Sequence, residues 1–317
     1  MASRVLFVGG TGPVGHASVP HLLAAGHDVA LAHTGSHEST ALSALEHLHG
    51  SRAELLARGG PAERWRPEVL IDTFAGGATA GKARELSDLA ERSAARQIVA
   101  LSSMDVYRHC ADAGVDGHTP VVLPRDTLPL REDAPLRTKP SPGGGSRHDN
   151  AAMEAALAAP AHITILRPGA IYGPHLDERV LREWYLVGRV ARGERRLPLP
   201  DGGTQLFHRV ALDRVGRAVA AAVERAPEGR FACNVGDPRH FTYGALATLV
   251  AERLDWTWEP EPVAWSEGDH PWNVRHPVVA DTTRLREVLG VLEPDPLAAT
   301  LELVDWLWAR RAELGSS

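Results

Sequence analysis

The chain has 317 residues, of which 44% are hydrophobic and 23% are charged, and its formal net charge is −6. This length suits one large domain or one domain with a smaller lobe, and the acidic balance disfavours binding to nucleic acid or to an anionic membrane. No apolar run approaches the roughly 20 residues that a membrane-spanning helix needs, the N-terminus does not resemble a signal peptide, and Cys110 and Cys233 are too few for a disulfide framework, so we expect a cytoplasmic protein.

The first half of the chain alternates short apolar runs with helical patterns. Strands are predicted at 4–8, 28–32, 45–49, 69–75 and 97–103, with helices that end near residues 25 and 95. Residues 163–173 are expected to form another strand followed by a loop. Buried strands separated by helices predict an α/β fold with a parallel, doubly wound sheet.

The second half is less regular. Residues 108–147 are rich in Pro, Gly, Asp and Arg, so we expect a long functional loop there. Helices are predicted at about 177–193, 212–225, 242–254, 282–289 and 297–312.

A glycine motif lies between the first strand and the first helix. Residues 10–15, GTGPVG, fit G-x-G-x-x-G, in which glycines let the backbone approach a pyrophosphate and helix N–H groups face the anion. We therefore predict a dinucleotide-binding domain over 1–174. Residues 175–317 are expected to form mostly a substrate-binding lobe, with the segment 207–235 also packing on the first domain.

The end of the second strand leaves the nicotinamide form open. NAD sites usually place Asp or Glu there, and NADP sites often place Arg nearby. Residues 32–37, AHTGSH, show neither signature, so His33, His37 and Arg52 are the candidates to meet a phosphate. Surface histidines are more often simply solvated, and no metal site is predicted from these histidines or from His47 and His49.

Several blocks resemble one known family in the same order: GGTGPVG (9–15), DTFAGG (72–77), ALSSMDVY (100–107), LREDAPLR (130–137), LRPGAIYGP (166–174), FACNVGD (231–237) and DTTRLREVLG (281–290). Together they resemble the extended short-chain dehydrogenase/reductase superfamily, in its NAD-dependent epimerase/dehydratase branch. The resemblance covers essentially the whole chain. It implies a Rossmann domain with about seven parallel strands, a smaller C-terminal lobe that includes the last two blocks, an NAD or NADP cofactor, and a homodimer.

The resemblance also implies roles for individual residues. Ser103 falls at the position of the family's catalytic serine, which hydrogen-bonds the substrate oxygen. The alternative interpretation is that Ser102 and Ser103 only cap the end of a strand. The implied cofactor contacts are Gly9, Gly10, Thr11, Gly12, Pro13, Val14, Gly15, His33, Thr34, Arg52, Thr73, Phe74, Ala75, Ser102, Pro168, Gly169 and Ala170.

The family's Tyr-x-x-x-Lys pair is absent. In that pair the phenol transfers a proton, and the lysine lowers the phenol pKa and holds the cofactor ribose. None of the four tyrosines (Tyr107, Tyr172, Tyr185 and Tyr243) has lysine four residues later. Aligning Glu154 with the acidic residue that commonly follows the motif puts Ser146 at the tyrosine position and Asn150 at the lysine position.

Three explanations for this absence remain open. In the first explanation another side chain transfers the proton. His148 is the main candidate, because an unperturbed imidazole has a pKa near 6.5, and Tyr107 and Asp105 are further options. Alternatively the substrate supplies its own acid, or the protein no longer transfers hydride. Ser146, Asn150, Trp272 and His276 are the candidate substrate contacts.

We therefore expect an atypical NAD(P)(H)-dependent oxidoreductase, of the carbonyl reductase, alcohol dehydrogenase or epimerase type, that acts on a small metabolite. The competing hypothesis is a non-redox protein on the same fold, either a ligand-binding regulator or a repurposed lyase or isomerase.

Overall fold

The computed structural model describes residues 2–36, 38, 40–113, 123, 125–139, 148–158, 160–174, 182–292 and 295–315. Within these ranges no helix combines the length and the apolar character needed to cross a bilayer.

The predicted parallel sheet is present. Its strands are β1 (Arg4–Val8), β2 (Asp28–His33), β3 (Glu46–His49), β4 (Val69–Asp72), β5 (Gln97–Leu101), β6 (His162–Pro168) and β10 (Gly229–Val235). They form one 7-stranded sheet in the order β10-β6-β5-β4-β1-β2-β3, and every pairing is parallel. This order confirms the doubly wound α/β fold. The chain reverses direction across the sheet between β1 and β4, where ligands of such folds bind outside the carboxyl ends of the strands.

Helices cover both faces of the sheet. The helices of the sheet domain are α1 (Pro13–Ala24), α2 (Arg52–Leu56), α3 (Pro61–Trp65), α4 (Ala80–Ser93), α5 (Arg108–Asp112), α6 (Asn150–Ala156), α8 (Leu212–Arg225) and α10 (Thr283–Glu287), with short 3-10 turns at Thr40–Leu42 and Met104–Val106 (η2). Helices α1 and α8 pack on one face with Phe7 and Leu31, whereas α4 and α6 pack on the other with Leu6 and Ile98. A Cβ on Gly216 of α8 would lie 2.2 Å from the carbonyl oxygen of Ala17, so glycine lets α8 approach α1 closely.

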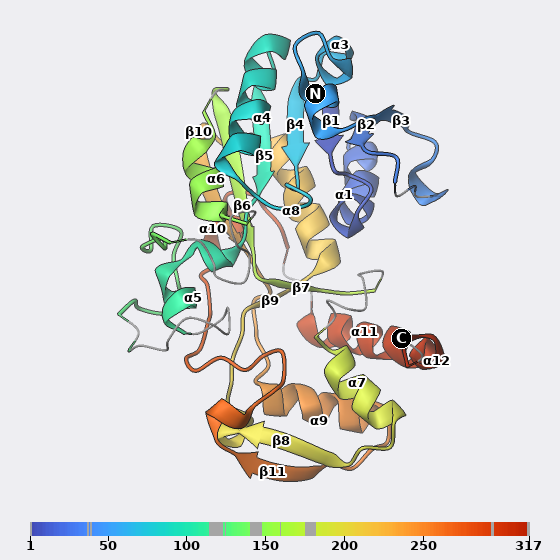
Figure 1. The fold of residues 1–317 in the computed structure, drawn as a ribbon, viewed down its shortest axis with the longest axis vertical. Helices are drawn as coiled ribbons and strands as arrows, with labels where there is room; N and C mark the ends of the chain where they lie inside the picture. The colour runs from blue at the N-terminus through green and yellow to red at the C-terminus, as the bar shows by residue number, and fades with distance from the viewer. Residues whose placement is uncertain are drawn as a thin grey trace.

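The smaller lobe lies beyond the carboxyl edge of the sheet (Figure 1). It contains β8 (Arg196–Pro200), β11 (Glu259–Val263), α7 (Trp184–Ala191), α9 (Tyr243–Arg253), α11 (Pro296–Ala309), α12 (Arg311–Leu314) and 3-10 turns at Asp201–Gly203 and Trp265–Glu267. The short strands β7 (Ala170–Tyr172) and β9 (Arg209–Ala211) pair between the two parts. Tyr243, Leu246 and Leu303 belong to the core of the lobe.

Two expectations about the second half differ from the structure in detail. The block 281–290, assigned to the lobe by resemblance, lies largely on the sheet domain, where Leu285 of α10 joins the α1–α8 core. The block 231–237, also assigned to the lobe by resemblance, forms most of β10, which is the edge strand of the sheet and ends the segment 207–235 that was expected to pack on the first domain. Residues 163–173, expected to be a strand followed by a loop, form β6 and then a second short strand, β7. At the break, the Gly169 N–H donates to the Val235 carbonyl, and a Cβ there would lie 2.6 Å from the His208 carbonyl oxygen.

Candidate active site

The loop between β1 and α1 is shaped for close approach of a ligand. Gly9 has φ +75°, and a Cβ on Gly15 would lie only 1.8 Å from the Gly10 carbonyl oxygen. In contrast, a Cβ on Gly12 would meet nothing nearer than the Gly9 carbonyl oxygen at 4.0 Å. Gly12 is also the N-cap of α1 and supplies no side-chain cap. The N–H groups of the first helical turn therefore depend on water or a ligand for partners.

A cavity of about 490 Å³ adjoins this loop. Eight of the predicted cofactor contacts line it: Gly9, Thr11, Gly12, Pro13, His33, Thr34, Arg52 and Ala75. The other nine do not: Gly10, Val14, Gly15, Thr73, Phe74, Ser102, Pro168, Gly169 and Ala170. Three of these nine are glycines that allow close packing of the backbone: Gly10 and Gly15 contact each other, and Gly169 packs against His208.

The cations of the cavity already have partners. Arg52 forms ion pairs with Asp72 at 2.7 Å and with Glu85 at 3.0 Å. Burial raises the pKa of Asp72, and the neighbouring Arg52 opposes that shift. Lys82 donates from Nζ to the carbonyl oxygens of Ala75 and Gly77, both at 2.8 Å. Sequence reasoning missed Asp72 and Lys82 as lining residues, although Asp72 lies within the predicted strand 69–75 and ends β4.

His33 occupies the position that usually recognises the ribose. It is buried, its Nδ1 accepts a hydrogen bond from the Gly35 N–H at 3.1 Å, and its Nε2 lies 2.8 Å from His47 Nδ1. Burial lowers the pKa of His33, so the imidazole is neutral near pH 7 and offers no positive charge to a phosphate.

Three candidate catalytic residues (Ser103, Asp105 and His148) and the candidate substrate contact Asn150 lie together where β5 meets the start of α6, with Ser103 joined to the others through the Asp105 backbone. The Asp105 N–H donates to Ser103 Oγ at 3.2 Å. The Asn150 amide nitrogen lies 3.1 Å from Asp105 Oδ1 and 3.1 Å from His148 Nε2. None of the four lines the dinucleotide cavity. Ser146, the residue aligned with the family tyrosine, lies outside the described residues.

Tyr107 lies behind this cluster in a buried network. Its hydroxyl donates to Asn234 Oδ1 at 2.6 Å and accepts from Arg167 Nη1 at 3.0 Å. Burial raises the pKa of Tyr107 to about 12. With no exposed surface, the phenol has no access to a substrate, and we assign it to packing instead of catalysis.

Ser102 and Ser103 have different surroundings. Ser102 Oγ donates to Glu154 Oε1 at 2.6 Å, and Arg167 binds both oxygens of the same carboxylate at 3.0 and 2.7 Å. All three side chains are buried. Ser102 therefore joins β5 to α6 and β6. The Ser103 hydroxyl accepts a hydrogen bond and keeps its own proton to donate.

Known structures share this fold over nearly the whole chain. MoeE5 in complex with UDP-glucuronic acid and NAD superposes with a TM-score of 0.69 at 19% identity, covering 98% of this chain and 99% of that one. TunA, an NAD-dependent NDP-hexosamine 5,6-dehydratase of tunicamycin biosynthesis, superposes with a TM-score of 0.71 at 17% identity, covering 97% and 98%. No protein-family model matches the sequence.

A curated relative is closer in sequence. It is a 3-diazoavenalumate denitrifying reductase of a Streptomyces species, 32% identical over 247 residues that span 70% of this chain and 73% of the relative. The chain belongs to the extended short-chain dehydrogenase/reductase superfamily. In this superfamily member, Asn150, which the sequence alignment on Glu154 put at the lysine position, is a buried amide that carries no charge.

Trp272 and His276 are the other candidate substrate contacts of this superfamily member that the structure describes. Trp272 is 2% exposed and packs in the core of the lobe, so almost none of its surface is available to a ligand. His276 is partly exposed. Neither residue lines the dinucleotide cavity.

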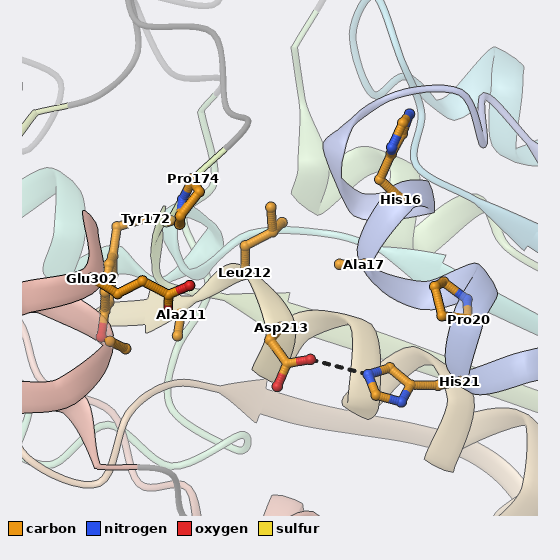
Figure 2. Close-up of a pocket in the computed structure, with 12 residues that line it drawn as sticks. His16, Ala17, Pro20, His21, Tyr172, Pro174, Ala211, Leu212, Asp213 and Glu302 are labelled. Carbon is orange, nitrogen blue, oxygen red and sulfur yellow. Dashed lines mark hydrogen bonds and ion pairs between the residues drawn. The ribbon is translucent and has the colours of Figure 1, made fainter. Parts of the chain in front are cut away.

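A second cavity, of about 440 Å³, lies between α1, α8 and α11. Figure 2 shows His21 on α1 facing Asp213 on α8, with the two side chains 3.1 Å apart, and Glu302 on the opposite wall. Because α1 and α8 cover the face of the sheet opposite α6, this cavity is separate from the Ser103 cluster.

Proposed function

We propose that this chain is a cytoplasmic NAD(P)(H)-dependent oxidoreductase that transfers hydride to or from a small molecule. The observation that carries the proposal is the position of Gly12 at the start of α1. Its missing side chain points into open space beside the cavity, at the N-terminus of a 12-residue helix without a side-chain cap. A pyrophosphate fits this position, since it brings negative charge and hydrogen-bond acceptors to the uncapped N–H groups.

Among the two forms of the cofactor, we propose NAD(H). A 2′-phosphate needs an available cation, but Arg52 is shared by two carboxylates and Lys82 by two carbonyl groups. His33 adds no charge because burial lowers its pKa. Gly9, Thr11, Gly12 and Pro13 would hold the pyrophosphate, and His33 and Thr34 would face the adenosine ribose.

The Ser103 cluster supplies groups for the substrate. A bound nicotinamide would supply or accept the hydride at the reacting carbon. Ser103 would donate its hydroxyl proton as a hydrogen bond to the substrate oxygen. The Asn150 amide donates toward His148 Nε2, which places the proton of a neutral imidazole on Nδ1. In the direction of reduction, a protonated His148 would give its Nε2 proton to that oxygen and become this neutral ring, whose Nε2 then accepts from the Asn150 amide.

A cofactor titration tests this proposal. Fluorescence of NADH and of NADPH is followed as purified protein is added, and we expect saturable binding with NADH the tighter ligand. If neither nucleotide binds at high micromolar concentration, the oxidoreductase proposal fails and a non-redox ligand-binding protein takes its place.

A second candidate function follows from the relative and from the absent Tyr-x-x-x-Lys pair. Hydride addition to an aryl diazonium group forms a C–H bond, breaks the C–N bond and releases N₂, while the reduced nicotinamide is oxidised. No oxygen has to be protonated in this reaction, so it does not need the missing pair. Denitrifying reduction of an aromatic diazo compound is therefore chemistry that this site supports.

The two candidates are separated by substrate and product. The protein is incubated with NADH or NADPH and either an aromatic diazo acid or a panel of aldehydes and ketones. Release of one N₂ for each nicotinamide oxidised supports the denitrifying reaction, and turnover of the carbonyl panel alone supports carbonyl reduction.

The superfamily resemblance also leads us to propose a homodimer. Light scattering coupled to size-exclusion chromatography measures the mass directly, and a monomeric mass at working concentration would reject this part of the proposal.

A further inference from the structure

Three histidines gather at the edge of the sheet beside the dinucleotide cavity. In the register of the parallel pair β2–β3, His33 lies opposite His49. His47 and His49 are two residues apart on β3, so they share a face of the sheet. Glu38, from the segment between these strands, completes the group. One ligand atom from each of these four residues lies within 4.8 Å of the others.

The hydrogen bonds assign the proton on each of two rings. Since His33 Nδ1 accepts from the Gly35 N–H, the neutral ring carries its proton on Nε2 and donates it to His47 Nδ1 at 2.8 Å. His47 then carries its own proton on Nε2 and donates it to the Leu42 carbonyl at 3.0 Å. The His47 Nδ1 lone pair therefore faces the cluster, where it accepts from His33, and a metal ion bound at Nδ1 would replace this hydrogen bond. A backbone carbonyl holds the other side of the ring. A metal-bound histidine in proteins usually has this arrangement.

A carboxylate faces the same point. Glu38 Oε1 lies 3.0 Å from His49 Nε2, and Glu38 Oε2 lies 3.6 Å from His47 Nδ1. Two imidazoles and one carboxylate are a ligand set that Zn²⁺ uses in proteins. The side chains of His49 and Glu38 are each 54% exposed, so both can turn to reach bonding distance.

We propose that this cluster is a site for a divalent transition-metal ion of the Zn²⁺ class, held by His47 Nδ1, His49 Nε2 and Glu38. His33 Nε2 is placed to take the fourth position. To do so its proton must move to Nδ1, which breaks the hydrogen bond from Gly35. His33 is therefore a weaker contributor than the other three residues.

The composition of the cluster favours a cation over a phosphate. Glu38 would repel an anion, and its two carboxylate oxygens face His47 and His49. The site is distinct from the proposed pyrophosphate position, although His33 belongs to both the cluster and the wall of the dinucleotide cavity. A bound ion would join β2, β3 and the segment between them at the exposed edge of the sheet.

Zinc binding by the full chain tests the proposal. Protein treated with a chelator and then dialysed is titrated with Zn²⁺ against a chromophoric competitor, and bound zinc is measured by elemental analysis. We expect one ion per chain and a rise in melting temperature on binding. His49→Ala and Glu38→Gln should each weaken zinc binding by about tenfold or more, whereas His33→Asn should weaken it less.

Two control variants keep the result specific. Glu46→Gln changes a carboxylate of the same strand that faces away from the cluster and accepts from Trp65 Nε1. His162→Ala removes a histidine at the start of β6, elsewhere in the sheet. Both should bind zinc as the unaltered chain does.

Absence of stoichiometric zinc binding in the unaltered chain would overturn the proposal, as would full binding by both His49→Ala and Glu38→Gln. Both substitutions change half-exposed side chains, so the folded protein remains available for measurement. A change of NADPH affinity in these variants without any loss of zinc would instead assign the cluster to phosphate recognition. Since zinc is measured directly, this result is independent of whether the chain transfers hydride.

Discussion

The Asn150 amide bridges Asp105 and His148, with its nitrogen 3.1 Å from Asp105 Oδ1 and 3.1 Å from His148 Nε2. Asn150 is a neutral amide, so it has no charge with which to lower the pKa of a phenol. It orients two titratable groups instead. This contact makes His148 the first residue to examine as a proton donor.

Replacement of His148 by Gln should lower kcat for carbonyl reduction by about 100-fold, because the site loses its proton donor. The affinity for NADH should not change, since His148 does not line the dinucleotide cavity. Steady-state kcat for carbonyl reduction and fluorescence titration with NADH measure the two effects separately. An unaltered kcat would remove His148 from the mechanism.

Replacement of Gly12 by Val should abolish dinucleotide binding and leave the fold intact. The backbone φ of −82° suits any residue, and the new side chain would enter open space, so the melting temperature should stay the same. Fluorescence titration with NADH measures the loss. Ala24→Val, which adds the same side chain at the exposed far end of α1, is the control. Binding retained in Gly12→Val would contradict the assignment of the phosphate loop.

Ser103 and Ser102 should respond differently to alanine. Ser103→Ala should reduce turnover by more than about tenfold at unchanged cofactor affinity, because a hydrogen bond to the substrate oxygen is lost. Ser102→Ala removes a donor to buried Glu154 and should mainly lower the free energy of unfolding, by about 1–3 kcal/mol. Parallel kinetics and denaturant titrations separate the two effects. Equal turnover in Ser103→Ala and the unaltered chain would make Ser103 a structural residue.

Breaking the buried Arg167–Glu154 pair should be costly. In Arg167→Ala the buried Glu154 carboxylate loses both arginine hydrogen bonds and keeps the one from the Ser102 hydroxyl. The free energy of unfolding should fall by about 3–5 kcal/mol, because a buried charge is left without its partner. Urea titration measures this loss. The double variant Arg167→Leu with Glu154→Leu should recover part of it, because no unpaired charge remains. A loss below about 1 kcal/mol for Arg167→Ala would show that the network contributes little to stability.

Acid should destabilise the lobe through buried histidines. Burial lowers the pKa of His240 and of His270 to about 4. Below the unfolded pKa, near 6.5, the unfolded chain binds more protons than the folded chain. Each of these histidines therefore contributes stability above pH 6.5 that decreases as the pH falls from about 6.5 to 4, by up to about 1.4 kcal/mol per pH unit.

His270→Phe isolates this contribution. The His270 ring stacks on Tyr243 with centroids 3.7 Å apart, so phenylalanine keeps the stacking and removes the titrating group. Melting temperatures from pH 7 to pH 4.5 should fall less steeply in the variant. Equal slopes would show that His270 does not titrate on unfolding in this range.

Most of the sheet and its ligand loop were predictable from local patterns. The apolar runs at 4–8, 28–32, 69–75 and 97–103 predicted β1, β2, β4 and β5, and GTGPVG predicted the turn into α1. Short helices such as α2 and α5, with five residues each, were not predicted, because so few residues show no helical periodicity. The place of β10 at the sheet edge depends on its pairing with β6, a contact between distant segments.

The sequence by itself determined the fold class, the phosphate loop and the absence of a Tyr-x-x-x-Lys pair, because these depend on residue type and spacing within short segments. Only the tertiary structure decided which serine is buried against Glu154, that the Tyr107 phenol is enclosed, and that Asn150 bridges Asp105 and His148. It also brought His33, His47, His49 and Glu38 together. The physical reason is that burial, pKa and ligand geometry depend on neighbours contributed by other strands and helices, and the register of those elements is set by packing of the whole core.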